Sequence, residues 1–471
     1  MPEVKDLSKP RRRNMPGLWE KIKRAYADFL SIPTYVVLGF VLLAIIVYVI
    51  DRTNLPLING LRDFLKHYIF GEAQNTIDFL SMLTGAIITV TSITISILML
   101  TLQQAANIMG DQVMDQFMHR NANQAFFGFF VGLSFYSMLV MASTNKGFNP
   151  VIGATLALLL TGFGLYLLVV LIYQTITQMQ PEEIIEKIHD ETLLARQRQW
   201  QLIKNTRKQP KSAGTETFPV HAQGHGFVTG IKFDALEEVA KVTKSEIILD
   251  VSFGSYVAYN DVLAKIKVDD PDKAVITGEK ILDAITLDMQ RDIRIDPAYG
   301  IEQFEMVAWT SVSSSKDNPE PGLLTIRSLR DVLSIWLADR QERNDRDSIP
   351  VVYKDDVFLK IFDTLGSLAV VSSESLQHQN YTEVLRTISI VYGRLPDDVG
   401  KRANDMIRRI LSALGDHVLT AELDIALSTL ESTLRQAGSN ETADDVQIAH
   451  DKLKQSIGEL SSRSTRVPQG G

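Results

Sequence analysis

The segment FLSMLTGAIITVTSITISILMLTL, residues 79–102, sets the architecture that we predict for the whole chain. It is long enough to cross a bilayer, and no Asp, Glu, Lys, Arg or His interrupts it. It also carries many hydroxyl side chains: Ser81, Thr84, Thr89, Thr91, Ser92, Thr94, Ser96 and Thr101. Because lipid cannot satisfy these polar groups, we expect this helix to face other helices or water.

Three further segments have the length and hydropathy of a membrane-spanning helix. Together with the first they predict a four-helix membrane domain over residues 32–175, with spans at about 32–50, 79–102, 125–143 and 151–173. No charged side chain or His falls inside these spans. Since proton-coupled carriers, pumps and voltage sensors usually need buried ionisable groups, the sequence argues against these three classes.

The distribution of Lys and Arg predicts the orientation. These residues are concentrated in a basic amphipathic segment, 1–31, and in the segment after the fourth span, whereas the loop between the third and fourth spans has Lys146 alone. An even number of spans places both termini on one side. We therefore expect both termini, and everything after residue 175, to be cytoplasmic.

The remainder of the chain predicts an α+β domain. A connecting helix and linker are expected at 176–212, and a small β-rich module at 213–270, where Val, Ile, Phe and Tyr alternate between glycines. Helical patterns then return. We expect a helical region at 271–345, a C-terminal helical region at 346–460 and a disordered tail at 461–471.

Two polar stripes run along the helix of residues 79–102. Helical spacing places Gly85, Thr89, Ser92, Ser96 and Gln103 on one line, and Thr84, Thr91, Thr94 and Thr101 on a second. Two interpretations stay open: a pore-lining face, or a packing seam in which hydroxyls bond across helices. In the third span, Gly128 and Gly132 form a GxxxG pair, which predicts a close helix contact within a tight bundle or a homo-oligomer.

Other chemistry has little support. The chain has no cysteine, which excludes disulfides, thiolate metal sites and cysteine nucleophiles. The pairs His221/His225 and Glu186/His189 lack the further ligands that a metal site needs. No nucleotide-binding loop or hydrolase motif is present. We therefore predict no enzyme, no cofactor and no metal, and the net charge of −8 argues against a nucleic-acid partner.

Several segments together resemble a domain-of-unknown-function family of predicted bacterial inner-membrane proteins. They are TVTSITISILMLTLQQAAN (89–107), HGFVTGIKFDALEEVA (225–240), SFGSYVAYNDVLAKI (252–266) and RDIRIDPAYGIEQFEMVAWTSVSSSKDNPE (291–320). The resemblance covers about residues 30–345 and implies an architecture and a bacterial inner-membrane location without an activity. More distantly, GFV and GSYVAYNDVLAKI resemble half-repeats of biotinyl- and lipoyl-type barrel sandwiches. That likeness would imply an adaptor-like module without a prosthetic group.

Two functional hypotheses follow from the sequence. The first is a homo-oligomeric, channel-like permeation protein in which the helix of residues 79–102 lies near the axis. The alternative is a membrane-anchored regulatory or scaffold protein that acts through its cytoplasmic domain on a protein or small-ligand partner. Both place the chain in the lipid bilayer.

Overall fold

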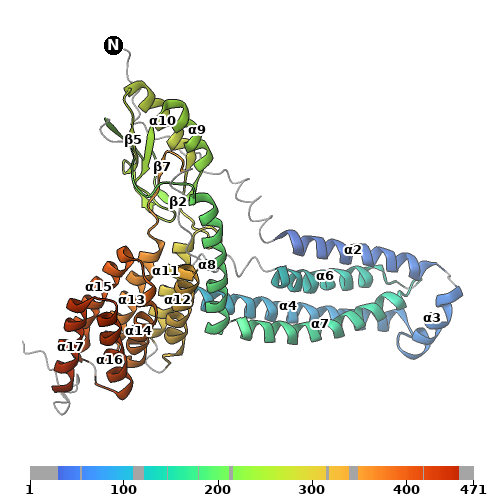
Figure 1. Ribbon diagram of the computed structural model, residues 1–471. Helices are drawn as coiled ribbons and strands as arrows, with labels where there is room; N and C mark the ends of the chain where they lie inside the picture. The colour runs from blue at the N-terminus through green and yellow to red at the C-terminus, as the bar shows by residue number, and fades with distance from the viewer. Residues whose placement is uncertain are drawn as a thin grey trace, which may run out of the picture. The chain divides into compact units, whose positions relative to one another are not determined.

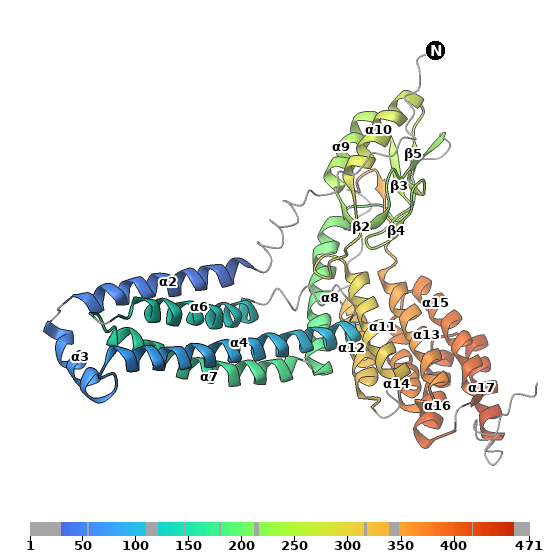
Figure 2. The ribbon, with the colours of Figure 1, turned by 180° about the vertical axis from the view of Figure 1, so that it is seen from behind.

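The computed structural model describes residues 30–455, except 54–55, 110–120, 146, 179, 212–215, 315–317, 339–347 and 417. The chain divides into two compact units, one ending at Gln180 and the other beginning at Pro181. They are called here the membrane unit and the C-terminal unit (Figures 1 and 2). The predicted basic segment 1–31, apart from its last two residues, and the predicted tail 461–471 lie outside the described residues.

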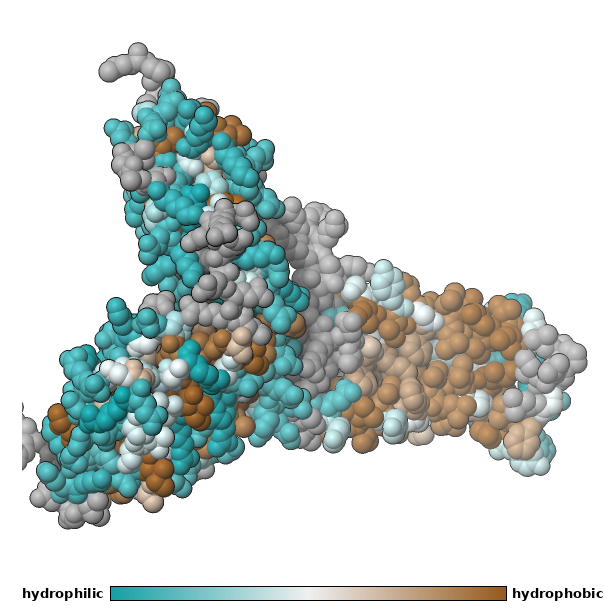
Figure 3. Space-filling view, viewed as in Figure 1, coloured by the Kyte–Doolittle hydropathy of each residue, from teal (hydrophilic) through white to brown (hydrophobic). Residues whose placement is uncertain are grey.

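The described elements of the membrane unit are all helices. Its helices are α2 (Ser31–Arg52), α3 (Pro56–Tyr68), α4 (Ala73–Met109), α6 (Asn121–Ser143) and α7 (Val151–Gln178). Among the described residues, four segments are long and apolar enough to cross a membrane: Ser31–Arg52, Ala73–Ile97, Gln124–Ser143 and Val151–Gln174. The four predicted apolar spans are thereby confirmed, and hydrophobic residues cover the visible face of these helices (Figure 3).

The core of the membrane unit joins all four long helices. It is built from side chains such as Phe40, Leu80, Leu133, Tyr136 and Ala157. Leu80, Tyr136 and Ala157 are 0% exposed. In a bilayer, apolar side chains could be surrounded by lipid at little cost, so the hydrophobic effect does not force them between helices. Their burial therefore reflects close van der Waals packing between helices, which is the main source of helix association in a bilayer.

The C-terminal unit begins with a long helix, α8 (Pro181–Ile203), and continues with a small α/β part. Two sheets are present in the described residues: a four-stranded sheet of order β1-β5-β3-β7 and a three-stranded sheet of order β4-β2-β6. All neighbouring strands are antiparallel except β3 and β7, which are parallel. The elements are β1 (Thr217–His221), β2 (Gly226–Ile231), α9 (Phe233–Thr243), β3 (Glu246–Leu249), β4 (Tyr256–Val257), β5 (Val262–Lys267), α10 (Pro271–Ala284), β6 (Ile285–Asp288) and β7 (Val351–Val352).

The α/β part extends beyond the module predicted at 213–270. Its core also includes Ile281 from α10, Ile285 from β6 and Val351 from β7. β7 has only two residues, too few for the alternation that identifies a strand in sequence, and the four residues of β6 follow directly on the end of α10. The strands form two sheets, with α9 following β2 and α10 following β5 in the chain, and this arrangement does not confirm the barrel-sandwich likeness.

The remaining elements of the C-terminal unit form a helical part. They are α11 (Pro297–Ser314), α12 (Glu320–Ala338), α13 (Val357–Glu374), α14 (His378–Val391), the 3-10 turn η2 (Tyr392–Arg394), α15 (Asp397–Leu411), the 3-10 turn η3 (Ser412–Asp416), α16 (Ala421–Gln436) and α17 (Asn440–Gln455). One continuous core runs through them, from Ile301 on α11 to Leu453 on α17. This core contains residues on both sides of position 345, where the sequence analysis placed a boundary between two helical regions.

Helix α8 belongs to the same helical part. Ile185 and Ile188 are 3% and 4% exposed and lie in the core with α11 and α12. Figures 1 and 2 show α8 alongside α11 and α12 from both sides. The segment predicted as a connecting helix is thus a packed element of the C-terminal unit.

Candidate functional site

The predicted stripe of helix α4 lies on its exposed face. Gly85, Thr89, Ser92, Ser96 and Gln103 are all exposed within the membrane unit. At 100° per residue they fall along the middle of the exposed arc of the helix, because every step between them is close to a whole number of turns. The polar line is therefore not a packing seam inside the described subunit.

The hydroxyls of this stripe bond mainly within their own helix. Thr89 Oγ1 donates to the carbonyl oxygen of Gly85 at 2.9 Å, and Ser96 Oγ donates to that of Ser92 at 3.0 Å. Such bonds use the hydroxyl proton and leave oxygen lone pairs free to accept. A Cβ added at Gly85 would meet no described atom within 4 Å outside the local helix backbone. The backbone there is open to close approach by another group.

The second stripe of α4 has the opposite surroundings. Thr84 is buried, and its Oγ1 donates to the Leu80 carbonyl oxygen at 2.7 Å and lies 2.7 Å from Oγ of Ser137 on α6. Thr94 is 1% exposed and Thr91 is half-buried. The side chain of Thr101 lies outside the described residues. Chemically similar hydroxyls thus serve an internal helix contact on one face and remain exposed on the other.

The glycine pair of α6 lies against α2 inside the subunit. A Cβ at Gly128 would lie 2.8 Å from Cα of Pro33, and one at Gly132 would lie 2.5 Å from Cδ2 of Phe40. Both distances are shorter than a real contact. The α2–α6 crossing therefore requires glycine, which has no side chain, at both positions. This contact within one chain occupies both glycines.

One end of the membrane unit is fixed by charged groups that the sequence analysis did not select. The Asp51 carboxylate at the end of α2 accepts from the backbone N–H groups of Ile152 (3.2 Å) and Gly153 (2.9 Å) in the first turn of α7. Nη2 of Arg62 on α3 donates to the carbonyl oxygens of Ile50 (2.9 Å) and Asp51 (2.8 Å). A carboxylate thus caps the start of α7, and a guanidinium caps the end of α2.

The sequence carried only a weak signal for this arrangement. Asp51 and Arg62 belong to no recognised motif, and they lie among other charged residues between the first two spans. The capping contact of Asp51 joins residues 102 positions apart. Such a partner cannot be inferred from local spacing.

A second cluster of charges joins the α/β part to the helical part of the C-terminal unit. The Arg291 side chain is 4% exposed, and its Nε donates to Oδ2 of Asp296 at 2.8 Å. Its Nη1 pairs with Glu302 on α11, which also pairs with Lys360 on α13. The guanidinium lies over two aromatic rings, Phe227 of β2 at 5.3 Å and Tyr299 of α11 at 4.8 Å.

The space around this guanidinium is tightly filled. Gly254 has a φ of +80°, and a Cβ there would overlap Nη2 of Arg291 and lie 2.6 Å from Oδ2 of Asp296. That Nη2 atom is buried without a hydrogen-bond partner in the structure. Burial raises the pKa of the neighbouring Tyr299 hydroxyl to about 12. The cluster is therefore a buried structural junction.

The histidines weighed as metal ligands have other contacts. His221 Nδ1 lies 2.9 Å from the carbonyl oxygen of Asn260, and His189 Nε2 lies 2.9 Å from Oδ2 of Asp331. In the described part of the chain, no group of three or more His, Cys, Asp or Glu side chains could hold a metal ion. The candidate site that we consider further is the exposed polar face of α4, formed by Gly85, Thr89, Ser92, Ser96 and Gln103.

Comparison with known proteins identifies the family. A family model described as "Predicted membrane protein (DUF2254)" matches residues 27–365. The match includes the membrane unit from α2 onward and the C-terminal unit into α13. No curated protein and no solved structure matches the chain. The matched region is well over half of the 471 residues, and the chain belongs to the DUF2254 family of predicted membrane proteins.

Proposed function

We propose that this protein is a homo-oligomeric permeation protein, in which the exposed polar face of α4 is turned toward other copies of the chain. One observation carries the proposal: Gly85, Thr89, Ser92, Ser96 and Gln103 lie in the middle of an exposed helix face, in a helix suited to cross a membrane. Hydrocarbon offers no partner for the hydroxyl lone pairs of Thr89, Ser92 and Ser96.

The flanks of the stripe agree with a contact between copies. Ile88 and Ile93 lie on either side of it and are 52% and 47% exposed. Aliphatic side chains there can pack against a partner helix or lipid, while the polar line faces a shared axis. The small residues in the line let helices approach closely, and several copies would surround a hydroxyl-lined path.

The length of α4 extends the polar line beyond the bilayer. The helix has 37 residues, which at 1.5 Å per residue is about 55 Å, against a hydrocarbon thickness of about 30 Å. Its candidate span ends at Ile97, so Gln103 lies past the apolar segment, at one mouth of the proposed path. The stripe itself carries no charge, which suits small water-soluble solutes or ions and does not provide a proton relay.

The orientation belongs to the same proposal. The Lys and Arg residues before the first span and after the fourth favour a cytoplasmic location for both termini and for the C-terminal unit. The family resemblance supports the bacterial inner membrane as the location. The Gln103 end of the path would then open to the cytoplasm.

Bulky apolar side chains on the stripe should block permeation. In vesicles containing the purified chain, we expect solute or ion flux under voltage, membrane tension or added ligand. Thr89→Leu and Ser92→Leu should reduce that flux to the level of protein-free vesicles, because each replaces a hydroxyl with a larger apolar group. The control is Leu159→Phe on α7, where an exposed apolar side chain is enlarged away from α4.

Absence of flux from the wild-type chain under all three stimuli would contradict the proposal, as would leucine variants that conduct normally. The scaffold alternative, acting through the C-terminal unit, would then be preferred. That alternative would in turn fail if deletion of residues 213–460 left the cellular phenotype unchanged.

A further inference from the structure

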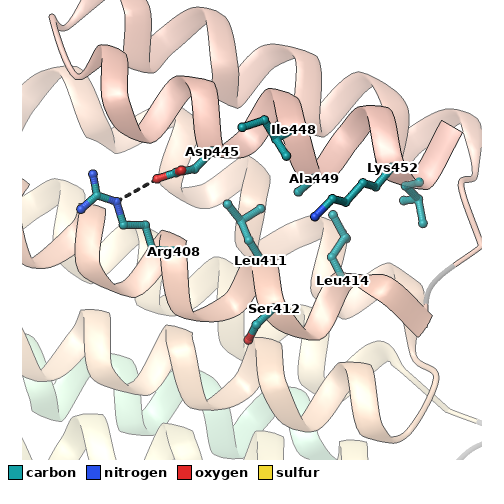
Figure 4. A pocket seen from close by; sticks show the side chains of 9 residues that line it. Arg408, Leu411, Ser412, Leu414, Asp445, Ile448, Ala449 and Lys452 are labelled. Carbon is teal, nitrogen blue, oxygen red and sulfur yellow. Dashed lines mark hydrogen bonds and ion pairs between the residues drawn. The ribbon is translucent and has the colours of Figure 1, made fainter. Parts of the chain in front are cut away.

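A cavity of about 620 Å³ lies in the helical part of the C-terminal unit, between α15, η3 and α17 (Figure 4). This volume is within the range of small-molecule sites, about 300–1,000 Å³. It lies beyond residue 365, where the match to the family model ends. Its lining residues are Arg408, Leu411, Ser412, Leu414, Asp445, Ile448, Ala449, Lys452 and Leu453.

One end of the cavity is closed by an ion-pair network. Nε of Arg408 on α15 lies 2.9 Å from Oδ2 of Asp445 on α17, and its Nη2 lies 3.0 Å from Oε2 of Glu441. The Arg408–Asp445 pair is visible at this end in Figure 4. Because two carboxylates already neutralise Arg408, its role is to hold α15 and α17 in register.

The floor of the cavity is apolar. Leu414 and Leu453 are 2% and 3% exposed and belong to the core of the helical part. Leu411 lies beside them, while Ile448 on the rim is 55% exposed. An apolar group placed here would remove both its own surface and that of Ile448 from water.

The ammonium group of Lys452 is directed over this floor. Figure 4 shows the Lys452 side chain extending from α17 between Ala449 and Leu414. Its ammonium makes no ion pair with a residue in the described ranges, whereas that of Lys454 lies 3.6 Å from Oδ1 of Asp424. The cavity thus combines an apolar floor with a positive charge that no described residue neutralises through an ion pair.

We propose that this cavity binds an amphiphilic anion, with one phosphate or carboxylate headgroup on Lys452 and an apolar body against Leu411, Leu414 and Leu453. The complementarity is of charge and of polarity: an anion supplies the counter-charge for Lys452, and its apolar part covers the leucine floor. The same chemistry is offered by a soluble amphiphile and by a membrane lipid headgroup. This site is separate from the stripe on α4 and does not depend on the proposed permeation function.

The test uses the full chain in phosphatidylcholine nanodiscs and n-octyl phosphate as the probe, titrated by calorimetry with empty nanodiscs as the background. We expect saturable binding to the wild-type chain. Lys452→Gln should weaken it about tenfold, because a hydrogen bond to a charged group is lost. Lys454→Gln is the matched control on the same helix and should bind as the wild type does. Ala449→Trp, on the α17 wall of the cavity, should obstruct it and abolish binding.

A neutral amphiphile separates charge recognition from damage to the fold. Octyl glucoside should bind equally to the wild-type chain and Lys452→Gln, since neither complex contains the ion pair. Nanodiscs with added phosphatidylglycerol distinguish the two sources of the anion: competition with octyl phosphate indicates a bilayer lipid, and its absence indicates a soluble amphiphile. The proposal is overturned if octyl phosphate does not bind the wild-type chain, or if Lys452→Gln and Lys454→Gln bind it equally.

Discussion

Replacing Arg291 with leucine should lower the free energy of unfolding of the C-terminal unit by about 3–5 kcal/mol, the usual cost of removing one partner from a buried ion pair. Asp296 would lose its counter-charge at a position where its side chain is 6% exposed. Glu302 would retain Lys360, so most of the cost falls on Asp296. Denaturant unfolding of the full chain, followed by tryptophan fluorescence, would measure the loss through Trp200 and Trp336 in this unit.

Two further variants isolate the cause of this loss. Arg294→Leu removes a neighbouring arginine whose partner is Asp292 and whose side chain is 63% exposed. It should cost less than about 1 kcal/mol, because exposed ion pairs contribute little. Adding Asp296→Asn to Arg291→Leu should recover part of the stability, since it removes the unpaired buried charge. Equal losses for Arg291→Leu and Arg294→Leu would show that the buried junction has no special role.

Replacing Asp51 with leucine should destabilise the membrane unit by about 2–4 kcal/mol, from the loss of a helix cap and of a buried charge that neighbouring groups compensate. The Asp51 side chain is 0% exposed, and two N–H groups of α7 would be left without their acceptor. Arg62 would keep the backbone carbonyl oxygens of Ile50 and Asp51. Unfolding by SDS in mixed micelles would measure the change.

Asp51→Asn should cost less than Asp51→Leu, because its amide oxygen can still accept from one of the two N–H groups. Asp63→Ala, at an exposed position on α3, provides the control and should leave the unfolding midpoint unchanged. The capping role would be refuted if the leucine and asparagine variants unfolded with the same midpoint as the wild-type chain.

Features that depend on local sequence could be predicted, and features that depend on distant partners could not. The four spans follow from length and hydropathy, which a single segment contains. The two stripes of α4 follow from helical periodicity. Which stripe faces inward is decided by the Thr84–Ser137 contact, and Ser137 lies 53 residues from Thr84. Periodicity alone could not distinguish Thr84 from Thr89.

The C-terminal unit shows the same limit. Strand β6 follows α10 without a break, and the two-residue strand β7 pairs with β3 across about a hundred residues. A connecting helix was predicted for the segment of α8, yet Ile185 and Ile188 form a narrow apolar line that packs on α11 and α12. The role of Arg291 depends on Phe227, Gly254 and Glu302, which no local pattern connects.

The central proposal is that the exposed polar face of α4 meets another copy of the chain. The chain has no cysteine, so a single introduced thiol reports on one position without further engineering. We propose to treat native membranes containing Ser92→Cys with a short, membrane-permeant bis-maleimide and to measure covalent dimers. Leu159→Cys, on α7 and 64% exposed, is the control for random encounter in the bilayer. The account predicts efficient cross-linking at position 92 and little at position 159. A Ser92→Cys chain that remains monomeric, or that cross-links no more than Leu159→Cys, would contradict it.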